Sequence, residues 1–352
     1  MPCRSLASES PSSAVERVGA RWWSGLLLFL AACGSGGGPD PAAERSLVEL
    51  ERLAFVPSGR LVISGLPGLR MAGPHADCSV PEPLVFDLFE MTRAEAARFD
   101  GDLPDAALSW EDAALLETEP ERADEPAPLS LSNARAIAEL RGMRLPTTRE
   151  WLHVALGGRG RLSPFPWGRA KAYSGGNTLE LGLGGPTIVG SFLGGRSRPF
   201  GCYDLVGNLA EWTEGVVPGY DDLPVRPETY LEGPWSKLFR SVMGGSYATR
   251  LEETYEFDLT TSGELRFYAK LVGVDHRSPD VGARMCAEAA DYLVEHAARW
   301  PSARNARERV ARVGARWAQE GREASLIALV DELAEAHPEL VALAWLVEGA
   351  RR

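Results

Sequence analysis

The segment at residues 201–212 constrains this chain most, because it combines a glycine reversal with two acidic side chains. It reads Gly-Cys-Tyr-Asp-Leu-Val-Gly-Asn-Leu-Ala-Glu-Trp. Gly207 permits a tight turn that residues with a side chain rarely adopt. Asp204 and Glu211 then lie at the two ends of a short loop, and their oxygens suit a hard cation.

The composition allows a sizeable core and argues against nucleic-acid binding. The chain has 352 residues, 45% hydrophobic and 24% charged, so both one large domain with an appendage and two medium domains are compatible with its length. The formal net charge of −12 disfavours a nucleic-acid groove, because phosphate binding depends on clustered Lys and Arg. Cation binding and ordinary solubility remain.

Residues 1–33 have the features of a lipoprotein signal peptide. Arg17 and Arg21 precede an apolar run at 22–32, which is too short to span a bilayer but fits a signal-peptide core. The run ends in Leu-Ala-Ala-Cys, which resembles the bacterial lipobox; in such signals the cysteine, here Cys33, is lipidated and becomes the N-terminus. We expect a lipid-anchored protein of the bacterial cell envelope, at the outer membrane on its periplasmic or surface side. The alternative is an ordinary signal in which Cys33 is incidental.

The cysteine count limits the disulfides of the mature chain. If Cys3 leaves with the signal and Cys33 carries lipid, the cysteines that remain are Cys78, Cys202 and Cys286. An odd number in an oxidising compartment allows at most one disulfide among them.

Alternating apolar residues and capping signals predict several short elements. Strands are expected at 53–63, broken by a Pro-Ser-Gly turn, and at 84–89. Thr92 with Glu95, and Thr147 with Glu150, have the spacing of a capping box. The predicted helices span residues 93–99, residues 133–141 with Ser132 as N-cap, and residue 148 to the Gly157-Gly158 pair.

A series of short motifs follows in a fixed order between residues 47 and 288. They read Phe-Val-Pro-Ser-Gly at 55–59, Phe-Glu-Met-Thr at 89–92, Arg-Leu-Pro-Thr at 144–147, Glu-Trp at 150–151, Pro-Trp-Gly at 166–168, Val-Gly-Ser-Phe at 189–192, the segment 201–212, Gly-Gly-Ser-Tyr at 244–247 and Gly-Ala-Arg-Met-Cys at 282–286. With these motifs the chain resembles the formylglycine-generating enzyme family, also called sulfatase-modifying factor domains. The resemblance implies a loop-rich α+β fold, a variant of the C-type lectin fold. It says less about activity, because this fold hosts many functions.

The resemblance also implies a structural calcium ion. Transferred position by position, its ligands are the side chains of Asp204 and Glu211 and the carbonyl oxygens of Gly207 and Leu209. Oxygen ligands from a flexible loop are what calcium favours. The alternative is that the two acidic side chains only hydrogen-bond loop amides.

The chain departs from the family after Ser246. Family members that oxidise a substrate cysteine to formylglycine carry two cysteines three and eight residues after this serine, and these bind copper(I). Thr249 and Thr254 occupy those positions here. A threonine hydroxyl is a hard, un-ionised ligand that cannot replace a thiolate. We therefore assign no catalytic residue and do not expect copper.

The remaining cysteines are not expected to replace the copper-binding pair. A bridge from Cys286 to Cys202 or to Cys78, or three plain buried thiols, are each favoured over a relocated metal site.

Residues 289–352 lie beyond the resemblance and are rich in Ala, Glu and Arg. We expect three or four short helices that pack on each other or on the main domain; a helical pair that docks a protein partner is the alternative. The charged residues Arg304, Glu308, Arg312 and Arg316 are expected on a solvated face. The apolar positions at helical spacing are Val310, Val313, Trp317, Leu326, Leu329, Val330, Leu333, Leu340, Leu343 and Val347.

The sequence thus predicts a signal peptide at 1–33, a linker at 34–46, a formylglycine-generating-like domain at 47–288 and a helical extension at 289–352. The predicted function is that of an envelope lipoprotein whose domain lacks the copper-binding cysteine pair and acts as a non-catalytic binding or scaffold module. The alternative is a sulfatase-modifying oxidoreductase, or a related non-haem metal oxidase.

Overall fold

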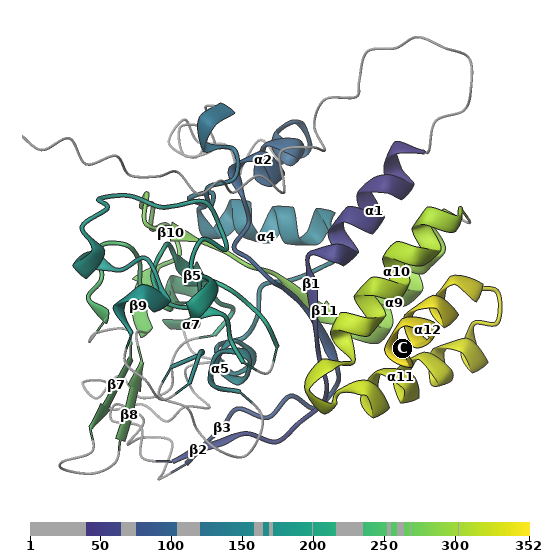
Figure 1. The fold of residues 1–352 in the computed structure, drawn as a ribbon. Helices are drawn as coiled ribbons and strands as arrows, with labels where there is room; N and C mark the ends of the chain where they lie inside the picture. Colours follow the sequence, from purple (N-terminus) through teal and green to yellow (C-terminus); the bar gives the residue numbers. More distant parts are fainter. Residues whose placement is uncertain are drawn as a thin grey trace, which may run out of the picture. The chain divides into compact units, whose positions relative to one another are not determined.

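In the described part of the chain, a three-stranded and a four-stranded sheet carry the architecture (Figure 1). The three-stranded sheet has the order β1-β4-β11 and is antiparallel throughout. The four-stranded sheet has the order β10-β5-β6-β9, with β10 parallel to β5. Further antiparallel pairs are β2 with β3 and β7 with β8. The strands are β1 Leu53–Val56, β2 Val62–Ser64, β3 His75–Asp77, β4 Leu84–Asp87, β5 Ala210–Trp212, β6 Phe239–Met243, β7 Tyr255–Asp258, β8 Glu264–Phe267, β9 Ala269–Gly273, β10 Val281–Gly282 and β11 Cys286–Glu288.

Helices and long loops surround these sheets. The structure, a computed structural model, describes residues 40–64, 75–103, 120–157, 165–168, 172–198, 200–215, 235–251, 255–258, 264–267, 269–301 and 303–352, so Cys33 and Thr254 lie outside the described residues. The α-helices are α1 Pro41–Glu51, α2 Arg93–Ala96, α4 Leu131–Leu140, α5 Thr148–Leu156, α7 Trp235–Leu238, α9 Ala289–Ala297, α10 Arg304–Trp317, α11 Glu323–Ala336 and α12 Ala344–Ala350. The 3-10 turns are η2 Ala97–Asp102, η4 Pro120–Arg122, η5 Tyr173–Gly175, η6 Leu179–Leu181, η7 Leu193–Gly195, η8 Gln319–Gly321 and η9 Val341–Leu343. Within these ranges, no helix has the length and apolar character needed to cross a membrane.

Both predicted capping boxes form. At α5 the Thr147 hydroxyl accepts from the Glu150 N–H at 3.2 Å, and the Glu150 carboxylate accepts from the Thr147 N–H at 2.7 Å. The helix ends before Gly157, as predicted. Thr92 and Glu95 cap α2 in the same way, although the α-helix gives way to the turn η2 at residue 97.

The predicted start of α4 is wrong by two residues. Ser130, and not Ser132, accepts from the Asn133 N–H, at 3.2 Å. Ser130 has extended backbone angles and is buried, whereas Ser132 is exposed in the first helical turn. Two serines two residues apart give nearly the same capping signal, and packing selects between them.

The C-terminal helices share a hydrophobic core with the main domain. One cluster of buried side chains contains Leu47 and Leu50 of α1, Phe55 of β1, and Val310 and Trp317 of α10. All the apolar positions predicted in this region are buried. The extension therefore packs both on itself and on the three-stranded sheet.

The extension also covers an open sheet edge. β1 lies at the edge of its sheet. The carbonyl of Leu53 accepts from Trp317 Nε1 and from Arg316 Nη2, both at 2.8 Å, and the carbonyl of Phe55 accepts from Arg322 Nη1 at 2.8 Å. These side-chain donors satisfy carbonyl groups that a neighbouring strand would bind if the sheet continued. An uncovered sheet edge can instead pair with a strand of another chain.

One charged residue of the extension differs from its prediction. Arg304, Glu308 and Arg312 are exposed as expected. Arg316 is only partly exposed, because its guanidinium reaches the edge of β1.

Two glycines allow α10 and α12 to cross closely. A Cβ added to Gly314 would lie 2.0 Å from the carbonyl oxygen of Leu346, and one on Gly349 would lie 1.7 Å from that of Ala311. Each clash is with helix backbone, which cannot move aside alone.

We expect Gly349→Ala to lower the free energy of unfolding by about 1–3 kcal/mol. Alanine is intrinsically about 1 kcal/mol better than glycine inside a helix, so a loss identifies the interhelical contact as its cause. Urea unfolding measures it. The matched control is Gly185→Ala, whose added methyl meets nothing within 4 Å. Equal midpoints for both variants would contradict the close crossing.

Candidate functional site

The loop at residues 201–209 takes a sharp, partly left-handed path before β5. Gly207 has φ 77°, and two residues with side chains also have positive φ, Asp204 at 55° and Asn208 at 62°. Asp and Asn tolerate this region better than other non-glycine residues. A Cβ on Gly207 would lie 2.1 Å from the carbonyl oxygen of Asn177, so glycine is needed for the close approach as well. The predicted tight reversal is confirmed.

A buried ion pair joins Glu211, directly after this loop, to Arg284 in the segment between β10 and β11. Arg284 donates from Nε to Glu211 Oε2 at 2.6 Å and from Nη2 to Oε1 at 2.5 Å. Trp151 Nε1 also donates to Oε2, at 2.6 Å. Burial opposes the charged guanidinium, but the adjacent Glu211 outweighs it and raises the pKa of Arg284. The guanidinium of Arg284 therefore keeps its positive charge inside the core.

Arg284 makes further hydrogen bonds that hold several segments together. Its Nη2 donates to the carbonyl of Tyr203 at 2.8 Å, and its Nη1 donates to the carbonyl of Asp87 at 3.3 Å. The guanidinium thus links the loop 201–209, the end of β4 and β5 to its own segment between β10 and β11.

Glu90 is a second buried acid in this region, and sequence reasoning missed its role. Its Oε1 accepts from the Leu209 N–H at 2.8 Å and its Oε2 from Asn208 Nδ2 at 2.7 Å. Burial, and then the negative charges of Asp204 and Glu211, raise the pKa of Glu90 well above its usual value. The available signal was an acid placed between apolar residues directly after a buried strand.

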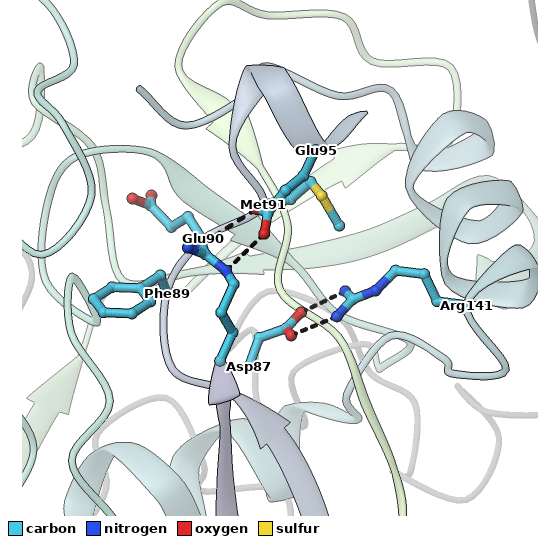
Figure 2. Close-up of a pocket in the computed structure, with 7 residues that line it drawn as sticks. Asp87, Phe89, Glu90, Met91, Glu95 and Arg141 are labelled. Carbon is cyan, nitrogen blue, oxygen red and sulfur yellow. Dashed lines mark hydrogen bonds and ion pairs between the residues drawn. The ribbon is translucent and has the colours of Figure 1, made fainter. Parts of the chain in front are cut away.

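Glu90 also lines a small polar pocket beside the end of β4. Figure 2 shows its carboxylate pointing away from the Asp87–Arg141 ion pair, whose two hydrogen bonds are both 2.9 Å long. Arg52 and Glu95 form a second ion pair across the pocket, at 2.6 Å. Four of its ionisable lining residues are paired with one another, and Glu90 is hydrogen-bonded to Asn208 and Leu209, so the pocket offers no unpaired charge to a ligand.

Asp204 is the least satisfied of the buried acids. Its Oδ2 accepts from the Gly190 N–H at 2.6 Å, but its Oδ1 is buried without a hydrogen-bond partner. Burial is the main cause that raises the pKa of Asp204 to about 6, and the charge of Glu211 adds to it.

The four predicted calcium ligands therefore differ in how well they fit an ion. Asp204 offers a buried oxygen that lacks a donor, which suits a cation. Glu211 is already engaged at both oxygens, and the guanidinium of Arg284 repels a second cation there. The carbonyls of Gly207 and Leu209 lie in the same loop. Among the described residues, no three His, Cys, Asp or Glu side chains come together as a metal centre. Calcium binding stays a prediction, with Asp204 as its best-fitting ligand.

The variant Asp204→Asn tests both the effect of burying the Asp204 carboxylate and the predicted binding of calcium. Because the pKa of Asp204 is raised from 3.8 to about 6 in the fold, the unfolded chain loses this proton first. The stability that Asp204 contributes at low pH is thus lost as the pH rises from about 4 to 6. In chelator, the free energy of unfolding of Asp204→Asn, relative to the unsubstituted chain, should rise over this range by an amount on the order of 2–3 kcal/mol.

Glu180→Gln is the control for this experiment. Burial opposes its ionisation, but hydrogen bonds from Thr178 and Leu251 outweigh that effect and lower the pKa of Glu180 from 4.5. The free energy of unfolding of Glu180→Gln, relative to the unsubstituted chain, should therefore fall as the pH rises toward 4.5 and stay constant above it. If calcium binds at Asp204, adding it should raise the melting temperature of the unsubstituted chain but not of Asp204→Asn. Identical curves with calcium and with chelator would show the calcium prediction to be wrong.

Thr249, the first of the two positions where the resemblance implies a copper-binding cysteine, is built into a turn. Thr249 is buried, and its Oγ1 accepts from the Ser246 N–H at 3.0 Å, while its own N–H donates to the Ser246 carbonyl at 2.9 Å. The described hydrogen-bond partners of the Ser246 hydroxyl are Asp280 at 3.1 Å, Thr249, and the N–H of Ala248. No imidazole or amine is among these described partners, and the group that accepts from the Ser246 hydroxyl is the Asp280 carboxylate.

No disulfide joins Cys78, Cys202 and Cys286, and all three are buried, as in the last of the predicted alternatives. Burial raises the pKa of Cys202 to about 12 and also raises the pKa of Cys286, although Arg144 Nη1 lies 3.2 Å from its sulfur. Thiols of this kind are neither nucleophiles nor ready metal ligands at neutral pH.

Comparison with known proteins places the chain in a family. The sequence profile of the Sulfatase-modifying factor enzyme 1-like domain matches residues 41–289. The chain belongs to this family, and the predicted α+β fold with C-terminal helices is confirmed.

Individual relatives match over shorter stretches. The chain is 38% identical over 104 residues to the inactive C-alpha-formylglycine-generating enzyme 2 of Bos taurus, covering 26% of this chain and 33% of that protein. It is 32% identical over 144 residues to the formylglycine-generating enzyme of Mus musculus, covering 37% of each. The chain thus spans about a third of the length of these relatives. PvdO from Pseudomonas aeruginosa, a solved structure, is 19% identical with a TM-score of 0.46, covering 67% of this chain and 94% of that one.

Proposed function

We propose that this chain is an envelope lipoprotein whose formylglycine-generating-like domain binds or scaffolds and does not catalyse. The observation that carries the proposal is Thr249. It stands where the family's oxidases hold their first copper thiolate, and its hydroxyl is used in a turn with Ser246. Proteins called inactive C-alpha-formylglycine-generating enzyme 2, from cattle and mouse, are among the relatives and support a non-catalytic role.

The remaining thiols do not supply a substitute. Oxygen activation by copper(I) needs two soft thiolates at one metal. Cys202 and Cys286 are buried protonated thiols, and the side chains around Thr249 offer hydroxyl and carboxylate oxygens. The alternative function is that of a sulfatase-modifying oxidoreductase or a related non-haem metal oxidase. An activity assay distinguishes it from the non-catalytic function.

The assay incubates the purified chain with copper(I), oxygen and a peptide containing Cys-x-Pro-x-Arg. We expect no peptide aldehyde above the level of a Thr249→Ala control, measured by mass spectrometry after hydrazide capture. The double variant Thr249→Cys with Thr254→Cys restores the cysteine pair and is expected to bind copper(I) more tightly than the unsubstituted chain. Aldehyde formed by the unsubstituted chain, and not by Thr249→Ala, would overturn the proposal.

The membrane anchor has its own test at Cys33. Cells expressing the full chain and fed an alkyne-tagged fatty acid are expected to label it, and Cys33→Ala is expected to abolish the label and release the protein from the membrane fraction. A mature N-terminus at any residue other than Cys33 would contradict the anchor.

A partner at the C-terminal helices is less well supported than a structural role for them. Their predicted apolar positions are buried, and Trp317 and Arg322 are engaged by β1. We therefore place the binding surface of the module elsewhere in the domain.

A further inference from the structure

Residues 172–198, called here the apolar loop segment, expose an unusual number of large apolar side chains. Eight such side chains are exposed in the described part of the chain, and five of them lie in this segment. Leu193 is the most open, at 76% exposed. The five are Tyr173, Leu179, Leu183, Ile188 and Leu193. Contiguous exposed apolar surface marks an interaction site more often than single exposed side chains do.

The buried polar groups described above hold this segment in place. Asn177 Nδ2 donates to the Gly185 carbonyl at 2.9 Å, and the Thr187 N–H donates to Asn208 Oδ1 at 2.9 Å. The Gly190 N–H donates to Asp204 at 2.6 Å. The apolar side chains between these points are therefore presented outward by a fixed backbone, and a partner need not pay the entropy of ordering it.

Two 3-10 turns of the segment touch each other. A Cβ on Gly195 of η7 would lie 1.8 Å from the carbonyl oxygen of Gly175 in η5. This contact brings together the turns that carry Tyr173 and Leu193, the exposed residues at the two ends of the apolar loop segment.

The charges of the segment differ in sign from those of the whole chain. Its acidic residue, Glu180, accepts hydrogen bonds from the Leu251 N–H at 3.0 Å and from the Thr178 hydroxyl at 2.8 Å. Arg196 and Arg198 are exposed at its end. In a chain of net charge −12, this segment thus combines exposed apolar side chains with two exposed arginines, of which Arg196 follows Leu193 by three residues and Arg198 donates from Nε to the Trp167 carbonyl. That combination suits an anionic lipid surface, where apolar groups enter the headgroup boundary and cations meet phosphates.

We propose that the apolar loop segment lies on the anionic surface of the membrane to which the protein is anchored. The proposal deepens the proposed function and rests on the anchor at Cys33. Residues 34–40 join that cysteine to α1, and an extended chain of this length reaches at most about 25 Å. The domain is therefore confined close to the bilayer, where weak apolar and electrostatic contacts are sufficient for docking.

The test uses the chain from Gly34 to Arg352, which contains the compact unit Asp40–Arg352 but carries no lipid. Its binding is measured by co-sedimentation with vesicles of phosphatidylcholine alone and of phosphatidylcholine mixed with phosphatidylglycerol. We expect binding to the anionic vesicles only, weakened by added salt. The double variant Leu183→Ser with Leu193→Ser should lower the affinity at least tenfold, since both leucines lose apolar burial.

The matched control is Val341→Ser, which removes a 70% exposed apolar side chain from η9. It should bind as well as the unsubstituted chain, and the urea midpoints of all variants should agree. Failure to bind anionic vesicles, or equal binding by the double variant, would overturn the proposal. So would a double variant that instead loses self-association in sedimentation velocity, because the segment would then join two copies. Because no lipid is attached in this assay, its failure leaves the labelling result at Cys33 untouched.

Discussion

The buried ion pair between Arg284 and Glu211 is the interaction on which the rest of the domain depends. Its guanidinium is completely buried and also reaches the carbonyls of Tyr203 and Asp87. Removing one partner of such a pair leaves an uncompensated charge in the core, which costs on the order of 3–5 kcal/mol. Segments far apart in sequence are thereby held in one arrangement, and the loop at 201–209 takes its left-handed path within it.

This frame does not depend on a cysteine at position 249. Thr249 keeps the turn at Ser246 closed by hydrogen bonds, so the fold does not need a cysteine there. The same frame fixes the apolar loop segment through Asp204, Asn208 and Asn177. A rigid scaffold that presents loops suits binding as well as it suits catalysis. That is why the family membership of the chain leaves its activity open.

Local signals were the most reliable guide to the fold. The Thr147–Glu150 capping box formed as predicted, because its donors and acceptors lie within one helical turn. The N-cap of α4 was misplaced, since Ser130 and Ser132 differ only in how they pack. The site was harder to predict: the motif placed Asp204 and Glu211 at the two ends of one loop, but Glu90 binds that loop from a strand end far away in the chain.

The motif at 201–212, the caps and the helical spacing after residue 289 are encoded locally, so the sequence was sufficient to establish the family and the fold class. Contacts between distant segments decided the rest. Glu211 is bound by Arg284 and Trp151, which bears on its use as a calcium ligand, and Arg316 turns from solvent to cap the edge of β1. The physical reason is that a buried charge takes whichever partner the packed core brings within hydrogen-bonding distance, and that partner is not its neighbour in sequence.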